Sequence, residues 1–252
     1  MTTYRIRRIA TLVGIELRLY FKSGPAVWWT FLLPAILLLL LSVGFGNGDT
    51  ATALGYLMGG LCSLVVVTAG LIGAAPYMVQ MRERRVFEVF GLLGMRPGDI
   101  AIGVALSRWI LAISQLTVMI ILGGVLLRGL RENSVIARLP AVLLILAIIS
   151  AVIQVLAQSV TLITKTAAGA RAVASAIGYG FIIAGNTGLE RVLPNRMAPL
   201  VSLLPTYHVR RAFEWALGRE TCWGNSILLM VVLMMMFGAV NSLCVRWRAR
   251  TL

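Results

Sequence analysis

Six long stretches of this chain contain no charged residue, and they restrict its possible folds more than any other feature. About 20 apolar residues cross the hydrocarbon core of a bilayer as a helix, and every stretch is near or above that length. A membrane-spanning β-barrel would need segments of about ten residues that alternate in polarity, whereas Ile36–Leu41 and Met230–Phe237 are apolar on every face. The sequence therefore predicts membrane-spanning helices within residues 23–48, 50–81, 109–127, 139–164, 172–189 and 221–245.

The composition excludes an ordinary water-soluble protein. Hydrophobic residues make up 59% of the 252 residues and charged residues only 13%, against about 25% charged residues in soluble domains. The 23 Lys and Arg outnumber the 9 Asp and Glu. They cluster beside the apolar stretches, without the interleaved aromatic side chains on which nucleic-acid bases stack. We therefore expect the basic residues to set the membrane orientation and to contact membrane lipids, and we expect no nucleic-acid partner.

The predicted fold is an all-α integral membrane protein that forms a single transmembrane domain over residues 1–252. It has six transmembrane helices, an N-terminal interfacial amphipathic helix, a short cytoplasmic helix and a partly helical outer segment before the last span. The interfacial helix is expected at residues 4–22. The spans are expected at approximately 26–46, 55–80, 101–127, 139–164, 172–188 and 223–245.

The N-terminal segment has the pattern of a helix that lies in the plane of the membrane surface. Its charged residues fall off an apolar stripe whose members recur every three or four residues: Ile6, Ile9, Val13, Leu17 and Tyr20. An even number of spans then places both termini on one side. The segments on that side carry fourteen basic residues and those on the other side eight, and such a bias marks the cytoplasm. We predict a multi-pass protein of the cell inner (cytoplasmic) membrane with both termini in the cytoplasm.

Two connecting segments are more than plain loops. Residues 82–100 begin with charges, continue with an apolar half and end at Pro-Gly, which indicates a short cytoplasmic helix. Residues 190–220 contain three prolines among apolar patches. That segment is too apolar for a solvated loop and too interrupted to span a bilayer, so we expect short helices that dip toward the membrane from outside.

The chain lacks several kinds of chemistry. A phosphate-binding P-loop needs a glycine directly before its lysine, and neither of the two lysines follows a glycine. All nine acidic residues lie outside the six stretches, which disfavours ion coupling through carboxylates at mid-membrane depth. The three cysteines and the single histidine have no zinc-binding spacing. We expect a protein that is not an enzyme, with no catalytic residue, cofactor or metal on this chain.

The polar groups predicted inside the membrane are mostly neutral. Four of them share one face of the fourth span, where they either line a substrate path or hydrogen-bond to a neighbouring helix: Ser150, Gln154, Gln158 and Thr161. Gly55 and Gly59 form a small-x-x-x-small step, which favours close helix packing. Arg108 lies about two turns into the third span, and we expect it to reach the cytoplasmic interface as a structural anchor.

The order of these parts resembles the permease subunits of type-2 ABC exporters. RERRVFEVFGLLGMRPGDI, at residues 82–100, is similar to the acidic start, Leu-rich helix and Pro-containing turn that lead into the family's third span. Val86 and Phe87 stand where the family commonly has Gly-Thr. LVSLLPTYHVRRAFEWALG, at residues 200–218, is similar to the family's signature before the last span. The matching residues are Glu83, Leu92, Leu93, Pro97, Ile100, Gly103, Pro205 and either Arg210 or Arg211.

The resemblance implies how the chain would work. It would pair with a second permease copy, as a homodimer, on separate ABC ATPase subunits that hold the ATP and magnesium. The path between the two permeases would carry an amphiphilic drug, lipid, peptide or polysaccharide. The short cytoplasmic helix would couple the chain to the ATPase through Glu83, Arg84, Arg85, Glu88 and Phe90. The outer segment would form a gate at Pro205, Tyr207 and Arg211.

Three other functions stay open from the sequence. A haem-exporter-like permease of cytochrome c maturation shares the general layout, although His208 is the only histidine available to handle haem. A channel or carrier outside the ABC class would transport without a partner. A membrane assembly protein is the third alternative.

Overall fold

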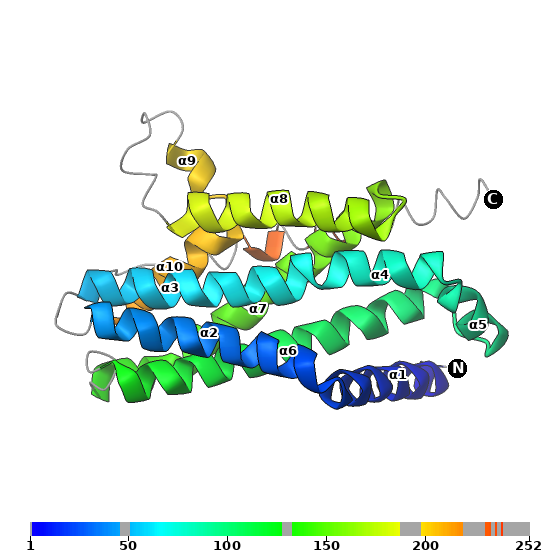
Figure 1. The fold of residues 1–252 in the computed structure, drawn as a ribbon, viewed down its shortest axis with the longest axis horizontal. Coiled ribbons are helices and arrows are strands. Elements are labelled where there is room, and N and C mark those ends of the chain that lie inside the picture. Colours follow the sequence, from blue (N-terminus) through cyan, green and yellow to red (C-terminus); the bar gives the residue numbers. More distant parts are fainter. Residues whose placement is uncertain are drawn as a thin grey trace.

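The computed structural model describes residues 2–45, 51–127, 133–186 and 198–218, together with 230–232, 235 and 238. Over these residues the regular structure is entirely helical, which confirms the predicted all-α class (Figure 1). The elements are α1 (Thr2–Lys22), α2 (Gly24–Phe45), α3 (Ala51–Val67), the π-helical turn η1 (Thr68–Ile72), α4 (Ala74–Glu83), α5 (Val86–Leu92), α6 (Pro97–Leu126), α7 (Asn133–Ile163), α8 (Ala167–Asn186), α9 (Ala198–Val201) and α10 (Pro205–Ala216).

Four helical segments are long and apolar enough to cross a membrane: Gly55–Glu83, Gly98–Leu126, Val135–Ile163 and Ala167–Asn186. They coincide with the second to fifth predicted spans. The first predicted span falls on α2, an apolar helix of 22 residues. The sixth predicted span, 223–245, lies almost wholly outside the described residues. The described part of the chain thus has the character of a multi-pass membrane protein.

The elements α3, η1 and α4 follow one another as a single long rod, and α6, α7 and α8 run beside it (Figure 1). The side chains of the rod supply much of the apolar core, including Met58, Cys62, Val65 and Leu71, which are fully buried. The rod ends at Glu83, where the guanidinium of Arg82 donates hydrogen bonds to the carbonyl oxygens of Thr161 and Thr164 at the end of α7. The end of the rod is thereby tied to the end of a neighbouring span.

The face of α1 that packs against the bundle includes most of the predicted apolar stripe, since Val13 is buried and Ile9, Leu17 and Tyr20 are half-buried. Leu12 and Glu16 are buried, whereas Ile6 is 61% exposed. Arg5 donates to the Asp99 carboxylate at 2.6 Å, and the Tyr77 hydroxyl lies 2.8 and 2.9 Å from the two oxygens of Glu16. Arg5 and Glu16 of α1 thus have polar partners inside the protein. Apolar residues at a membrane surface can instead be covered by lipid.

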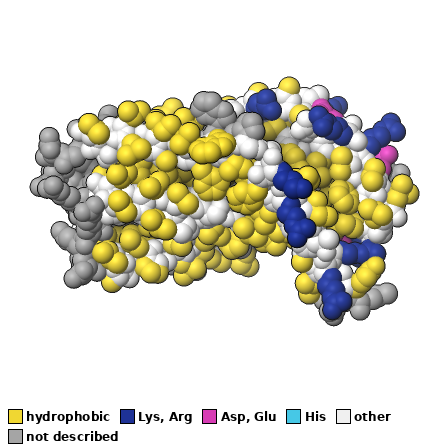
Figure 2. Space-filling model, turned by 60° about the horizontal axis from the view of Figure 1, so that its bottom comes forward, with side chains coloured by type: hydrophobic (Ala, Val, Ile, Leu, Met, Phe, Trp, Pro, Cys, Tyr) yellow, Lys and Arg dark blue, Asp and Glu magenta, His cyan; other side chains and the backbone are white. Residues whose placement is uncertain are grey.

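Basic residues gather at one end of the molecule. Figure 2 shows Lys and Arg at the end formed by α1 and α5, whereas most of the remaining visible surface is apolar. This basic end, as we call it below, brings together clusters that are far apart in the sequence. Ion pairing joins α1 to the start of α6, and the end of α4 contacts the loop after α7. A largely apolar surface beside this basic end is expected of a protein whose body lies in hydrocarbon.

Candidate functional site

A short helix, α5, projects from the basic end between the rod and α6 (Figure 1). The chain turns sharply before it because Arg85 adopts a left-handed backbone conformation, with φ of 55°. A non-glycine residue in this region is uncommon and costs conformational energy. The helix itself covers only Val86–Leu92, so it is shorter than the whole segment 82–100 in which the sequence places it.

The apolar residues of α5 divide into two groups. The Phe90 ring packs, together with Val86 and Phe87, against a small core cluster that includes Leu12 and Ile100. Three residues on the other side are uncovered: Val89 is 59% exposed, Leu92 90% and Leu93 64%. Exposed apolar residues that cluster at one tip commonly mark an interaction site.

The predicted coupling charges lie around these exposed apolar residues, and each makes different contacts. The Glu83 carboxylate accepts a hydrogen bond of 3.0 Å from the Ala167 backbone N–H, so it holds the first turn of α8. Arg85 and Glu88 form a solvent-exposed ion pair at 3.9 Å, and such pairs contribute little to stability. Arg84 is exposed. The α5 tip, as we call it below, consists of Arg84, Glu88, Val89, Leu92 and Leu93.

At the other end of the bundle, α10 is sunk between α3, α7 and α8. It runs antiparallel to α3, since Thr206 lies beside Ser63 and Glu214 beside Gly55. The start of α10 therefore lies twelve residues along α3 from Ala51, or about 18 Å at 1.5 Å per residue. The outer segment thus dips deeply along the rod.

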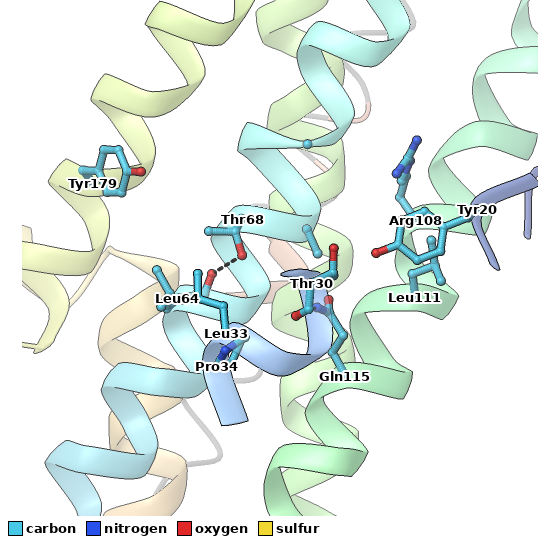
Figure 3. Close-up of a pocket in the computed structure, with 12 residues that line it drawn as sticks. Tyr20, Thr30, Leu33, Pro34, Leu64, Thr68, Arg108, Leu111, Gln115 and Tyr179 are labelled. Atoms are coloured by element: carbon cyan, nitrogen blue, oxygen red, sulfur yellow. Dashed lines mark hydrogen bonds between the residues drawn. The ribbon is translucent and has the colours of Figure 1, made fainter. Parts of the chain in front are cut away.

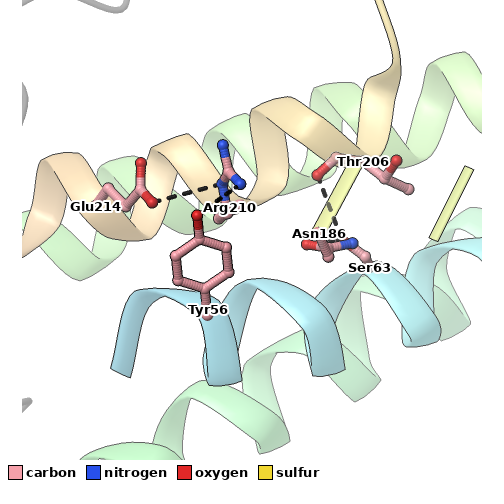
Figure 4. Close-up of polar contacts among 6 residues, drawn as sticks. All are labelled: Tyr56, Ser63, Asn186, Thr206, Arg210 and Glu214. Atoms are coloured by element: carbon pink, nitrogen blue, oxygen red, sulfur yellow. Dashed lines mark hydrogen bonds and ion pairs between the residues drawn. The ribbon is translucent and has the colours of Figure 1, made fainter. Parts of the chain in front are cut away.

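Buried polar contacts hold α10 in this position (Figure 4). The Arg210 guanidinium donates to the Tyr56 hydroxyl at 3.2 Å and lies 3.5 Å from the Glu214 carboxylate. The Thr206 hydroxyl donates to the Phe181 carbonyl at 2.6 Å. At the far end of α10, Arg138 donates to the carbonyl oxygen of Trp215 at 3.0 Å. Both ends of α10 are therefore fastened to neighbouring spans.

Glycines allow the close approach of α10 from two sides. A Cβ atom at Gly59 of α3 would lie 2.7 Å from the Arg210 Cα, and one at Gly185 of α8 would lie 2.7 Å from the Tyr207 backbone nitrogen. Real Cβ atoms are not found so close to backbone atoms. The small-x-x-x-small step at Gly55 and Gly59 therefore serves close packing, as expected, and its partner is the outer segment.

The structure places all three predicted gate residues on α10. Pro205 is buried at the first position of the helix, where a missing N–H has no cost. Tyr207 is half-buried, and its ring centre lies 5.1 Å from the Arg210 guanidinium carbon and 5.7 Å from that of Arg211. The Tyr207 ring thus lies close to two guanidinium groups of its own helix.

His208 makes α10 sensitive to acid. Burial, assisted by the charge of Arg211 and opposed by a 2.7 Å hydrogen bond to the Ser202 carbonyl, lowers the pKa of His208 from 6.5 to about 4. The unfolded chain therefore binds more protons than the folded chain between these values. The stabilising effect of a neutral His208 is complete above about pH 6.5 and is lost as the pH falls toward 4.

We expect acidification from pH 7.5 to 4.5 to destabilise the parent protein by up to about 3 kcal/mol more than the His208→Gln variant, because glutamine cannot take up the proton. Thermal unfolding in a nonionic detergent at both pH values measures this difference. The same loss of stability in parent and variant would show that carboxylates alone cause it.

The predicted polar stripe of α7 is partly buried. Ser150 and Gln154 have little exposed surface, and within the described residues neither side chain has a hydrogen-bond partner. The Thr161 hydroxyl donates to the Gln158 carbonyl of its own helix. None of the four residues lines the cavity described next. Whether the stripe lines a path or joins helices stays a prediction.

Sequence reasoning missed a cavity of about 340 Å³ that lies between α1, α2, the rod and α6 (Figure 3). Its polar lining includes Tyr20, Thr30, Thr68, Arg108 and Gln115, and its apolar lining includes Leu33, Pro34, Leu64 and Leu111. Its lining residues come from α1, α2, α3, η1, α6 and α8, so no local motif could have revealed it. Arg108 was the one signal, since a cation within an apolar segment costs about 2.5–3.5 kcal/mol and is commonly functional.

No protein-family profile matches the chain, and no curated protein is significantly similar to it in sequence.

Proposed function

We propose that this chain is the membrane-spanning permease subunit of an ATP-driven exporter of the type-2 ABC class. Two copies would form a path for an amphiphilic substrate, and a separate ATPase would supply the energy. The chain would lie in the inner membrane with its basic end in the cytoplasm, in keeping with the positive-inside bias. The observation that carries the proposal is the α5 tip, an uncovered apolar patch with charges around it at the basic end.

The position of α5 suits it to transmit force. It joins the end of the rod directly to the start of α6, so a displacement of α5 acts on two spans at once. Phe90 fixes α5 to the bundle through Leu12 and Ile100. The outward group, Val89, Leu92 and Leu93, is left for a partner. A solvated charge run that served only to orient the chain would not need these exposed apolar side chains.

The rod provides a connection from the basic end to the outer segment. Its α4 part ends at α5, and its α3 part forms the seat of α10 at Gly59. A shift of the rod along its axis would therefore change the seat of α10. In this proposal, ATP-driven movement of α5 releases the outer segment and opens the path outward.

The proposal predicts an ATPase gene beside the gene of this chain, and the test is to co-express the two and to purify the chain by a tag. We expect the ATPase to co-purify in an equal amount, and transport in liposomes to require both proteins and ATP. A catalytically inactive ATPase serves as the control and should bind without supporting transport. Transport by the chain alone would overturn the proposal in favour of an independent channel or carrier.

A further inference from the structure

The cavity beside α6 lies inside the span and near its basic end. Arg108 is eleven residues beyond Pro97, where α6 begins, which corresponds to about 16 Å along the helix. The rim residues Leu33 and Tyr179 are exposed within the described part of the chain, so the cavity is open toward the outside of the bundle there. Its wall includes Thr68 and Ala69 of η1, and π-helical turns within α-helices frequently occur at functional sites.

Within the described residues, no ion pair balances the charge of Arg108. No carboxylate of the described residues lies within ion-pair distance of it, and its Nε atom is buried without a hydrogen-bond partner there. Its guanidinium carbon lies 4.4 Å from the Tyr77 ring centre and 5.8 Å from that of Tyr20. The nearby Glu16 carboxylate accepts the Tyr77 hydroxyl instead. Two aromatic faces thus hold a permanent cation against the cavity.

A second polar group in the wall is incompletely satisfied. Gln115 is only 3% exposed, and its Nε2 donates to the Thr30 carbonyl at 2.7 Å, which fixes the orientation of the amide. The Oε1 atom is buried, and within the described residues no donor reaches it. A buried acceptor without a donor is unfavourable, so this position favours a ligand that offers an O–H or N–H group.

These features together describe the ligand. Arg108 and Gln115 are seven residues apart on α6, or about 10 Å along the helix axis, and Leu33, Leu64 and Leu111 lie among the apolar walls. We infer that this cavity binds an amphiphile whose anionic headgroup pairs with Arg108 and whose body carries a hydrogen-bond donor that reaches Gln115. A carboxylate and a phosphate monoester share the headgroup chemistry, since a guanidinium binds both. The binding of this ligand does not depend on the proposed function. Its identification as the exported substrate does.

The test measures binding of radiolabelled oleate to the purified chain, without any ATPase, in a nonionic detergent. Competitors of the same chain length separate the headgroups: oleyl phosphate, oleyl alcohol and oleylamine. We expect oleate and oleyl phosphate to compete at least tenfold better than the alcohol or the amine. The better of the two anions identifies the headgroup as a carboxylate or a phosphate. Equal competition by the neutral and anionic compounds would overturn the inference.

Two variants assign the contacts. Arg108→Gln should weaken oleate binding at least tenfold and leave oleyl alcohol unaffected, whereas Arg171→Gln, which removes an exposed arginine on α8, should change neither. Ricinoleate, which adds a hydroxyl to the oleyl chain, should bind the parent more tightly than oleate, and Gln115→Leu should abolish that preference. Parent-like oleate binding by a folded Arg108→Gln would refute the role of Arg108. If Arg108→Gln does not fold, Arg108→Lys is tested instead and should keep the preference for anionic ligands. Loss of that preference in Arg108→Lys would also count against the inference.

Failure of this inference is distinguishable from failure of the proposed function. If oleate binding depends on Arg108 but no ATPase associates with the chain, the ligand site is supported and the exporter function is refuted. If transport requires the ATPase but the chain shows no anion-selective binding, the exporter function is supported and this ligand site is refuted.

Discussion

Replacing Leu92 and Leu93 by aspartate is expected to abolish co-purification of the ATPase while the chain still inserts and folds. Both side chains are largely exposed, so their loss removes no packing from the bundle. In a partner groove, however, each would be a central apolar contact, and such contacts contribute about 2 kcal/mol or more. Two lost contacts correspond to about a thousandfold weaker association, and burial of the new carboxylates would weaken it further. Pull-down with the tagged chain and ATP-dependent transport measure the effect.

The control is Ile6→Asp, which places one aspartate on an exposed apolar residue of α1 at the same end of the molecule. It should leave ATPase association intact. Phe90→Ala offers a second comparison, because that ring faces the core cluster. Its loss should lower the thermal stability of the chain as well as its association. Parent-like association of the Leu92→Asp, Leu93→Asp variant would leave α5 as a structural turn only.

Replacing Gly59 by leucine is expected to unseat α10 and to destabilise the protein by about 3 kcal/mol. The new Cβ would lie 2.7 Å from the Arg210 Cα and 3.0 Å from its Cβ. These atoms belong to or adjoin the backbone, so no side-chain rotation relieves the clash. Helix α10 must then move away from α3, with strain and lost packing like those of other overpacked cores. Thermal unfolding in detergent measures the change.

The neighbouring Gly60→Leu variant is the control, because a Cβ there meets no atom within 4 Å. Both substitutions gain similar helix propensity over glycine, so the difference between them isolates the contact with α10. We expect Gly60→Leu to stay close to the parent. Equal stability of the two variants would mean that α10 does not rest on Gly59.

Several features could be predicted from the sequence because they depend on local properties. The length and apolarity of a segment decide whether it can cross a bilayer, so the charge-free stretches located the four described helices that are long and apolar enough to do so. The small residues Gly55 and Gly59 likewise predicted close packing, since only glycine permits such an approach. The charged segment 82–100 predicted a short helix, although the left-handed turn at Arg85 and the short extent of α5 were not apparent.

The tertiary structure decided which faces meet. For α1, hydrophobic periodicity indicated an apolar stripe, and Val13 of that stripe is buried. The partners of Arg5 and Glu16, which are Asp99 and Tyr77, were not apparent from the sequence. The identity of the helix opposite Gly59, and the depth to which α10 sinks, depend on residues about 150 positions away. The cavity at Arg108 is lined by residues of six helical elements, which extend in sequence from Tyr20 to Tyr179. The sequence by itself thus determined which segments are helical and apolar enough to enter a membrane. The packing of these segments against one another determined which buried polar groups lack a hydrogen-bond partner. Such a partner comes from a neighbour in space, which need not be a neighbour in the chain.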